Sequence, residues 1–406
     1  MECKQEKEAW ISVFKSGQNR KKLGIYLHIP FCRSKCLYCD FCSFPHPKEE
    51  AVEAYVSVLC GDLERRAQNC SDYTVDTVYF GGGTPSLLPP RLLLRVLKTV
   101  IRCYRVTADA EITLECNPAT ASRDALVSLR RGGFNRLSIG LQSTQDRELR
   151  ALGRIHSFAD FTRTFGDARK AGFENISADL MSGIPLQTVE SYLQSIEQLA
   201  ILAPEHISAY GLIVEEGTPF FRMQDRLAIP DEEAAREMYF CGIEALLTHG
   251  YAQYEISNFA RPGYESRHNL KYWNCEEYLG FGVAAYSDFG GDRFGNSRDF
   301  EAYLRGESIE CERETPTLDV RMNEYVMLRM RLCAGISASE FQKRYGSSFE
   351  ERFGRRMKSY ETHGLIRRNG DIAAFTPEGF YLSNAVLSEL LDFSDGISNT
   401  ETEKNS

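Results

Sequence analysis

Three cysteines form the part of this sequence whose residue types and spacing most directly predict chemistry. Cys32, Cys36 and Cys39 follow the pattern C-x3-C-x2-C inside the stretch GIYLHIPFCRSKCLYCDFCSF, residues 24–44. Zinc sites usually combine two distant pairs of cysteine or histidine, whereas three thiolates in one short loop are typical of an iron–sulfur cluster. A [4Fe-4S] cluster held by three cysteines leaves one iron open to another ligand. We therefore predict a four-iron cluster, with a plain zinc-binding module as the non-catalytic alternative.

A regular alternation of strands and helices must position this loop. Ile25, Leu27 and Ile29 alternate with polar residues as in a strand, and Pro30 ends it because proline cannot donate a ladder hydrogen bond. Further strands, each followed by a helical pattern, are expected at residues 75–80, 111–115, 136–141, 175–180 and 206–213. Repeated βα units build a parallel sheet or barrel. The predicted fold is therefore α/β, a partial (β/α)6 barrel.

Glycines and polar residues gather where these strands end. A GGGTP segment at residues 81–85 follows one strand and lacks the spacing of the known nucleotide-binding glycine motifs. Carboxylate, amide and guanidinium side chains stand at or after the ends of the next strands. The candidates are Gly83, Thr84, Glu115, Gln142, Arg154 and Asp179. Because ligands of parallel α/β folds lie at the carboxyl ends of the strands, we expect these residues and the cysteine loop to share one active site.

The repeat stops near residue 251. The HNLKYW segment at residues 268–273 is expected to be a loop at the open side of the barrel, followed by a glycine-rich stretch at residues 278–287 and a turn-like segment at residues 290–298.

A second unit comes next. Helices are expected at residues 323–332, 337–345 and 349–362, and a hairpin is expected around residues 368–371. Three helices and a hairpin are typical of a winged helix, although acidic residues offset the basic ones on its third helix, which argues against DNA binding. We divide the chain into an N-terminal extension (1–23), the barrel (24–290), a winged-helix-like C-terminal domain (291–392) and a disordered tail (393–406).

Composition narrows the class of protein. The chain of 406 residues has a net charge of −9, which argues against general nucleic-acid binding. It contains no apolar run long enough to cross a membrane and no secretory signal at its N-terminus. Its 13 cysteines are odd in number and scattered, which suits a reducing compartment better than a disulfide scaffold. These features predict a cytoplasmic protein without stable membrane insertion.

Several segments together carry a family resemblance. They read YLHIPFC, YFGGGTPS, LECNP, RLSIGLQS, LGRIHS, DLMSGIP, HISAYGL and FGVAAYS. With these segments the chain resembles, over nearly its whole length, the oxygen-independent coproporphyrinogen III oxidase family of the radical S-adenosylmethionine (SAM) superfamily. The resemblance implies that Cys32, Cys36 and Cys39 hold the cluster, whose open iron binds SAM. It further implies SAM contacts at Tyr26, Tyr38, Gly83, Thr84, Glu115, Gln142, Arg154, Asp179, Gly211 and Tyr286.

The family has an oxidase branch, which converts porphyrinogen propionates to vinyl groups, and a heme-chaperone branch. The oxidase has a fourth cysteine where this chain has Phe41, and it has a longer segment before the strand that here contains Tyr26. The HNLKYW segment, with His268, matches a chaperone-branch motif linked to heme, whereas Tyr286 stands where that branch often has histidine. The resemblance thus favours the chaperone, with the oxidase and a radical SAM methylase or cyclopropanase as alternatives.

If the chain belongs to the chaperone branch, the resemblance also implies which cofactors and partners it binds. We expect a [4Fe-4S] cluster, SAM and heme as cofactors. His268 is the expected heme ligand, and Cys275 and Tyr278 are the alternatives. The expected partner is a heme-acceptor protein, with peripheral contact to membrane proteins and no nucleic acid.

Overall fold

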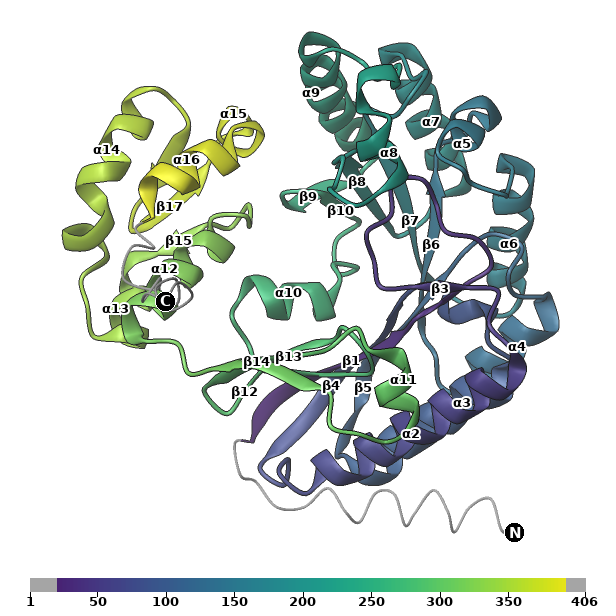
Figure 1. The fold of residues 1–406 in the computed structure, drawn as a ribbon. Helices are drawn as coiled ribbons and strands as arrows, with labels where there is room; N and C mark the ends of the chain where they lie inside the picture. The colour runs from purple at the N-terminus through teal and green to yellow at the C-terminus, as the bar shows by residue number, and fades with distance from the viewer. Residues whose placement is uncertain (1–19, 392–406) are drawn as a thin grey trace, which may run out of the picture.

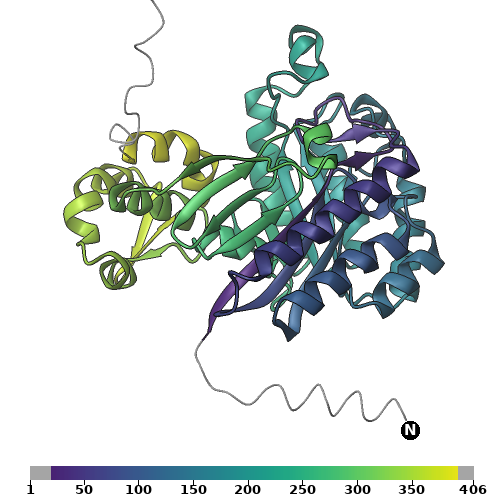
Figure 2. The same cartoon turned by 60° about the horizontal axis from the view of Figure 1, so that its bottom comes forward.

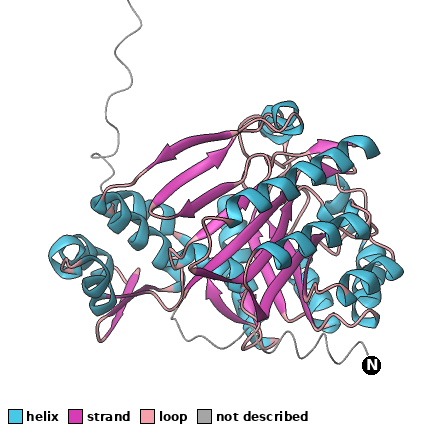
Figure 3. Ribbon diagram, turned by 90° about the horizontal axis from the view of Figure 1, so that it is seen from below, coloured by secondary structure: helices cyan, strands magenta, loops and turns pink. Residues whose placement is uncertain are grey.

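A curved sheet with helices packed along it forms the larger part of the molecule. The computed structural model describes residues 20–391, so the predicted disordered tail and most of the predicted N-terminal extension lie outside the described residues. Within this range the main sheet has the strand order β14-β13-β12-β11-β1-β4-β5-β6-β7-β8-β10-β9 (Figure 1). Figure 3 shows its strands side by side with helices along them. None of the helices in residues 20–391 is long and apolar enough to cross a bilayer.

Six neighbouring parallel strands confirm the predicted barrel. They are β1 (Lys21–Ile29), β4 (Tyr73–Gly82), β5 (Val106–Cys116), β6 (Arg136–Gln142), β7 (Asn175–Ser182) and β8 (His206–Gly211). The helices between them are α2 (Glu49–Ala67), α3 (Pro90–Cys103), α4 (Arg123–Arg131), α5 (Asp146–Ala151), α6 (Phe158–Lys170) and α7 (Val189–Leu202), and α8 (Pro219–Arg222) and α9 (Glu232–Thr248) follow β8. Every residue of β6 is buried, as expected for a strand covered on both faces.

Side chains at the helix starts fix where the connecting loops end. Ser157 and Asp160 form a capping box at the start of α6, and Thr188 and Ser191 form one at the start of α7. Each box satisfies backbone N–H groups that a helix leaves unpaired in its first turn. The caps therefore fix the ends of the α5–α6 loop, which carries Arg154, and of the loop that follows β7.

Both edges of the parallel core carry additional strands. On one edge β11 (Tyr278–Phe281) pairs in parallel with β1, followed by antiparallel β12 (Tyr286–Phe289), β13 (Asp292–Asn296) and β14 (Glu310–Glu314), while α11 (Phe300–Leu304) lies between the last two. On the other edge β10 (Asn258–Ala260) and β9 (Ala252–Glu255) are antiparallel. The segments expected as a glycine-rich stretch and a turn are thus strands β11 to β13.

A separate core builds the C-terminal unit. Its elements are α12 (Leu318–Arg329), β15 (Ile336–Ser337), α13 (Ala338–Tyr345), the π-helical turn η3 (Glu350–Gly354), α14 (Arg355–Thr362), β16 (Ile366–Asn369), β17 (Ile372–Phe375), α15 (Pro377–Tyr381) and α16 (Ser383–Leu390). The three helices α12 to α14 and the β16–β17 hairpin confirm the winged-helix-like prediction. Figure 2 shows strands of the sheet edge reaching toward this unit.

The domain division at residues 290 and 291 falls inside the β12–β13 hairpin of the main sheet. We propose instead a division at residues 315–317, between β14 and α12, because the sheet continues to Glu314. At the other end β1 begins at Lys21, three residues before the barrel boundary expected at Gly24.

The HNLKYW segment is a helix, not the loop expected from its composition. It lies within α10 (Arg267–Trp273), whose N-cap Ser266 accepts a hydrogen bond from the backbone N–H of Asn269. Glu111 of β5 accepts from the backbone N–H groups of Arg267 and His268 at 3.2 and 3.1 Å. The carboxylate thus satisfies two of the orphan donors that every helix start presents.

Candidate cofactor site and family

A cavity of about 150 Å³ lies where the central strands end, and most of the predicted site residues line it. The lining includes the three cysteines together with Tyr38, Gly83, Thr84, Glu115, Gln142, Arg154 and Asp179. These are ten of the fourteen residues expected at the site, and they come from five neighbouring strands, β1 and β4 to β7, and the segments that follow them. The parallel topology explains this convergence, because it brings the carboxyl ends of neighbouring strands to one edge.

The cysteine loop is anchored at both ends and in its middle. Phe31–Cys32 (β2) pairs with Phe44–Pro45 (β3), which closes the loop. Leu37 donates its backbone N–H to the carbonyl of Leu152 at 3.1 Å. The carbonyl of Leu37 in turn accepts from Phe220 at 3.0 Å. The loop therefore has a defined shape in the described structure.

Cys42 lies outside the group of cysteines that line the cavity. Cys32, Cys36 and Cys39 border it, whereas Cys42 does not. The backbone carbonyl of Cys42 contacts the Nε2 atom of buried His28 at 2.8 Å. Phe41, at the position of the oxidase's fourth cysteine, lines the cavity and is 66% exposed.

A chain of hydrogen bonds connects the first cysteine to the second. Cys32 Sγ lies 3.5 Å from Thr84 Oγ1, which accepts from Asn117 Nδ2 at 2.8 Å. Asn117 Oδ1 accepts from Arg154 Nη2 at 3.1 Å, and Arg154 Nη1 donates to Cys36 Sγ at 3.3 Å. Arg154 also donates to the Gly140 carbonyl at 2.7 Å. One guanidinium thus orients both the cysteine loop and the end of β6.

The charge of Arg154 suits a site that holds thiolates. Burial by itself lowers the pKa of its guanidinium, but the neighbouring Tyr38 and Cys36 raise that pKa above its usual value. The side chain therefore stays a cation inside the cavity wall. A cation at this place can balance part of the negative charge that three metal-bound thiolates bring to the cavity.

Two partly buried carboxyl groups line the same cavity as this cation. Glu115 accepts from Tyr79 Oη at 2.9 Å and from the Gly82 backbone N–H at 3.1 Å. Burial raises the pKa of Glu115 to about 7 and the pKa of Asp179 to about 6. Asp179 accepts from Ser138 Oγ at 3.3 Å. A cationic ligand would restore the charged form of both groups, because an opposite charge nearby favours ionisation.

Backbone geometry shapes the floor of the cavity. A Cβ atom on Gly83 would come within 2.7 Å of the Phe31 carbonyl oxygen, so this strand end can approach the cysteine loop only as glycine. Gln142 has a φ of 74°, a left-handed conformation uncommon outside glycine, and its Oε1 accepts from Tyr210 Oη at 3.0 Å. Strained residues of this kind concentrate at functional sites.

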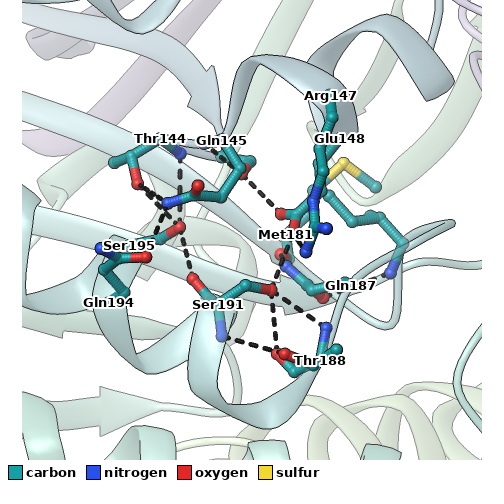
Figure 4. Close-up of polar contacts among 12 residues, drawn as sticks. Thr144, Gln145, Arg147, Glu148, Met181, Gln187, Thr188, Ser191, Gln194 and Ser195 are labelled. Carbon is teal, nitrogen blue, oxygen red and sulfur yellow. Dashed lines mark hydrogen bonds and ion pairs between the residues drawn. The ribbon is translucent and has the colours of Figure 1, made fainter.

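Behind the cavity, a buried carboxylate ties α5 to α7 (Figure 4). The side chain of Glu148 is fully buried and accepts from Ser143 Oγ and Ser191 Oγ, both at 2.7 Å. Gln187 donates from Nε2 to the carbonyl of Met181 at 3.0 Å. Ser143 follows Gln142 directly, so this network holds the loop that carries the left-handed turn.

Four predicted residues lie away from this cavity. Tyr26 contacts His28 Nδ1 through its hydroxyl at 3.1 Å. Gly211 lines a different cavity beside α9, and Tyr286 is exposed on β12, where its hydroxyl donates to Glu312 at 3.0 Å. His268 is buried, with one ring nitrogen 2.8 Å from Thr77 Oγ1 and the other 2.9 Å from Tyr272 Oη.

His268 does not lie at the open side of the barrel, where its segment is expected from the sequence. Thr77, Glu111 and Gly24 lie in or before the middle of their strands, so α10 packs below the cofactor residues instead of covering the open end of the barrel. Burial lowers the pKa of His268 to about 3, which keeps its imidazole neutral. Coordination of iron would require Thr77 or Tyr272 to give up its hydrogen bond.

Several lining residues were not singled out from the sequence. Asn117, Ser138 and Tyr210 border the cavity and hydrogen-bond to predicted site residues. The signal for Asn117 was its place directly after a strand, in the segment LECNP. Ser138 and Tyr210 stand inside strands, where alternation alone does not show which face is turned to a ligand.

The donor set fits the predicted cluster. Three thiols border one cavity, a buried guanidinium donates to one of them, and Thr84 contacts another. Among residues 20–391, no three histidine, cysteine or acidic side chains meet closely enough to hold a single metal ion. A cluster with several irons, when bound by Cys32, Cys36 and Cys39, would supply an open iron for SAM.

Comparison with known proteins agrees with the fold and the site. The family model of the radical SAM superfamily matches residues 26–199, and that of the HemN C-terminal domain matches residues 317–382. Among solved structures, the coproporphyrinogen III oxidase HemN of Escherichia coli superposes with a TM-score of 0.81 over 95% of this chain and 93% of that chain, at 23% identity. This likeness shows a shared fold.

Relatives that match over most of their length show more closely which family the chain belongs to. The heme chaperone HemW of Bacillus subtilis is 35% identical over 376 residues, covering 90% of this chain and 98% of the relative. HemW of Escherichia coli is 34% identical, covering 91% and 98%. A mouse protein named radical S-adenosyl methionine domain-containing protein 1, mitochondrial, is 38% identical, covering 69% and 67%.

The fold and the three-cysteine cavity define a radical SAM protein, a class whose cofactors are a [4Fe-4S] cluster and SAM. The chain belongs to the HemW family, the heme-chaperone branch of the oxygen-independent coproporphyrinogen III oxidase family. The resemblance stated from the sequence is thereby confirmed.

Proposed function

We propose that this protein binds heme and transfers it to an acceptor protein, with a [4Fe-4S] cluster and SAM as resident cofactors. The observation that carries the proposal is the match, over 98% of their length, to Bacillus subtilis and Escherichia coli proteins named heme chaperone HemW. Phe41 at the position of the oxidase's fourth cysteine points the same way.

The cavity residues receive roles within this proposal. Cys32, Cys36 and Cys39 hold the cluster, and Glu115 and Asp179 accept hydrogen bonds from the ammonium or ribose hydroxyls of SAM. Arg154 faces the SAM carboxylate, a group that guanidinium recognises well. Tyr26, Gly211 and Tyr286 remain proposed contacts, which the cavity described above does not include.

The acceptor and compartment are part of the same proposal. Heme delivery needs a heme-free acceptor protein, and contact with membrane proteins would be peripheral. Free thiols and a cluster are preserved in a reducing compartment, so we place the protein in the cytoplasm.

A paired assay tests the proposal. The protein is reconstituted anaerobically with iron and sulfide, titrated with heme, and mixed with a heme-free acceptor while the Soret band of each protein is followed. In parallel, the same preparation receives coproporphyrinogen III, SAM and a reductant, and vinyl products are counted. We expect heme binding and transfer without vinyl formation. Efficient decarboxylation would identify an oxidase, and absence of heme binding would reject the chaperone.

A further inference from the structure

A second and larger cavity lies between the sheet edge and the C-terminal unit. Its volume is about 820 Å³, within the range of about 300–1,000 Å³ that ligand pockets span. Its walls come from the first residues of β1, the end of α10, strands β11 to β13, and helices α12 and α13. Within the described chain it is therefore bordered by both units of the fold.

Aromatic and apolar groups form part of its wall. The rings of Tyr272 and Tyr278 meet edge to face, with centroids 4.6 Å apart and planes at 84°. Tyr345 and Met327 of the C-terminal unit also line the cavity. Flat aromatic surfaces and a flexible thioether are suited to packing against a large planar ligand.

Cationic side chains line the same cavity. They are Lys21, Lys22, Arg293, Arg321 and Arg344. Arg293 and Arg321 pair with carboxylates, among them Glu324 and Asp288. Arg344 instead donates to two backbone carbonyls, those of Asn274 at 3.2 Å and Cys275 at 2.8 Å. Its guanidinium charge is thus available to an anionic ligand, on a chain whose net charge is −9.

A thiol stands in the wall beside this guanidinium. Cys275 directly follows α10 and its C-cap Asn274, and it has a φ of 51°, a left-handed conformation that glycine or asparagine usually supplies at a helix end. Cys275 lines the cavity and is partly buried, whereas Cys333 of the C-terminal unit is also partly buried but does not line it. Thiolate sulfur, like imidazole nitrogen, is an established axial ligand of heme iron.

We propose that this cavity is the heme-binding site, with Cys275 as axial ligand and Arg344 paired with a heme propionate. The inference rests on the proposed function and assigns it a place distinct from the cluster cavity. When the iron–sulfur bond forms, the thiol of Cys275 releases its proton to solvent. Tyr272 separates His268 from the cavity, because its ring lines the wall while its hydroxyl bonds His268.

Cys275→Gly is the sharpest test of the ligand. Glycine removes the sulfur and also adopts a left-handed φ without strain, so the variant should fold at least as well as wild type. We expect heme affinity to fall at least about 10- to 100-fold, the loss typical when a residue that only supports a metal ligand is removed, and the red-shifted Soret band of a thiolate-bound ferrous heme–carbon monoxide complex to disappear. Cys333→Ala, the matched control, should keep both.

Arg344→Gln tests the anion contact. It should weaken heme binding about tenfold, which corresponds to about 1.4 kcal/mol for one lost contact to a propionate charge. The dimethyl ester of heme, which lacks propionate charge, should bind wild type and Arg344→Gln equally. Lys343→Gln removes the same charge from the neighbouring position of α13, which does not line the cavity, and should leave heme affinity unchanged.

The possible results separate the site from the function. If wild type binds no heme, the proposed function fails and the site fails with it. If wild type binds heme but Cys275→Gly retains its affinity and spectrum, the function stands and this site is wrong. Loss of heme in a folded His268→Ala variant, with Cys275→Gly unaffected, would move the ligand to α10.

Discussion

Arg154 donates a hydrogen bond to the sulfur of Cys36 across a sequence separation of 118 residues. The contact joins the loop after β1 to the segment after α5, and the same guanidinium holds the carbonyl of Gly140 at the end of β6. A Cβ atom on Gly140 would come within 2.6 Å of this guanidinium. The position of Arg154 is therefore set from both sides before any cofactor binds.

Loss of Arg154 should weaken SAM binding more than it weakens the fold. In Arg154→Ala the SAM carboxylate loses a charge-assisted contact worth about 1.5–3 kcal/mol, which corresponds to about a 10- to 100-fold rise in Kd. The measurement is anaerobic equilibrium dialysis of SAM against the reconstituted protein. Arg150→Ala, on the exposed face of α5, is the control. Equal affinity in wild type and Arg154→Ala would remove this residue from the SAM site.

Only three cysteines should be needed for the cluster. Alanine at Cys32, Cys36 or Cys39 removes a thiolate that lines the cavity, so iron and sulfide contents after anaerobic reconstitution should fall sharply. Cys42→Ala should retain both, because its sulfur does not border the cavity. Iron, sulfide and visible absorbance are the readouts, with circular dichroism as a check on folding. A Cys42→Ala protein without a cluster would contradict the three-cysteine site.

SAM affinity should depend on pH near neutrality. Burial raises the pKa of Glu115 to about 7 and that of Asp179 to about 6. Each group attracts a cationic ligand only when ionised, so the Kd of SAM should rise as pH falls from about 8 to about 5.5. Glu115→Gln should flatten the upper part of this curve, and Asp124→Asn on α4 should leave it unchanged. A pH-independent Kd in wild type would show that these carboxyl groups do not contact the ligand's cation.

The same two carboxyl groups should destabilise the ligand-free protein as pH rises. Between the ordinary pKa of an unfolded carboxyl and the raised folded value, the folded state binds more protons, so unfolding becomes easier with increasing pH. Denaturant unfolding without SAM should therefore gain stability in Glu115→Gln relative to wild type above about pH 7. No such difference between the two proteins would mean that the unligated site already solvates the charge.

His268 should contribute to stability with the opposite dependence on pH. Its folded pKa of about 3 lies below the ordinary value of 6.5, so protonation favours unfolding as pH falls below that ordinary value. His268→Ala leaves Thr77 and Tyr272 without their partner and should lower the unfolding free energy by about 1–3 kcal/mol at neutral pH. Denaturant curves of wild type, His268→Ala and exposed His249→Ala measure this. Equal stability of all three would show that the two contacts contribute nothing.

The sequence predicted the six parallel strands well because their alternating or continuous apolar runs have no competing pattern. It failed at β11 to β13, where glycines look like turns. A Cβ on Gly280 would come within 2.1 Å of the carbonyl oxygen of Tyr286, so this glycine permits close strand contact and does not mark a loop. Helix α10 was missed because seven residues carry little periodicity, although Ser266 is a regular N-cap.

The cofactor cavity was largely predictable and the second cavity was not. Strand-end positions follow from the order of βα units, which places Glu115 and Asp179 at one edge. Gly211 and Tyr286 were assigned by resemblance alone. Gly211 ends β8 but lines the cavity beside α9, and Tyr286 is exposed on β12, so neither borders the cofactor cavity. The second cavity is lined by residues as far apart in the sequence as Lys21 and Arg344, and a local sequence pattern cannot predict that such residues lie close together.

Strand β1 connects the two cavities as a spacer of fixed length. Lys22 borders the larger cavity near the start of the strand, and the cysteine loop begins just beyond Ile29 at its end. At about 3.3 Å per residue these two positions lie roughly 23 Å apart, whereas bond-making chemistry requires reacting atoms within about 3–3.5 Å. A porphyrin held beside Cys275 would therefore be out of reach of a radical generated at the cluster. It would be bound and released without chemical change.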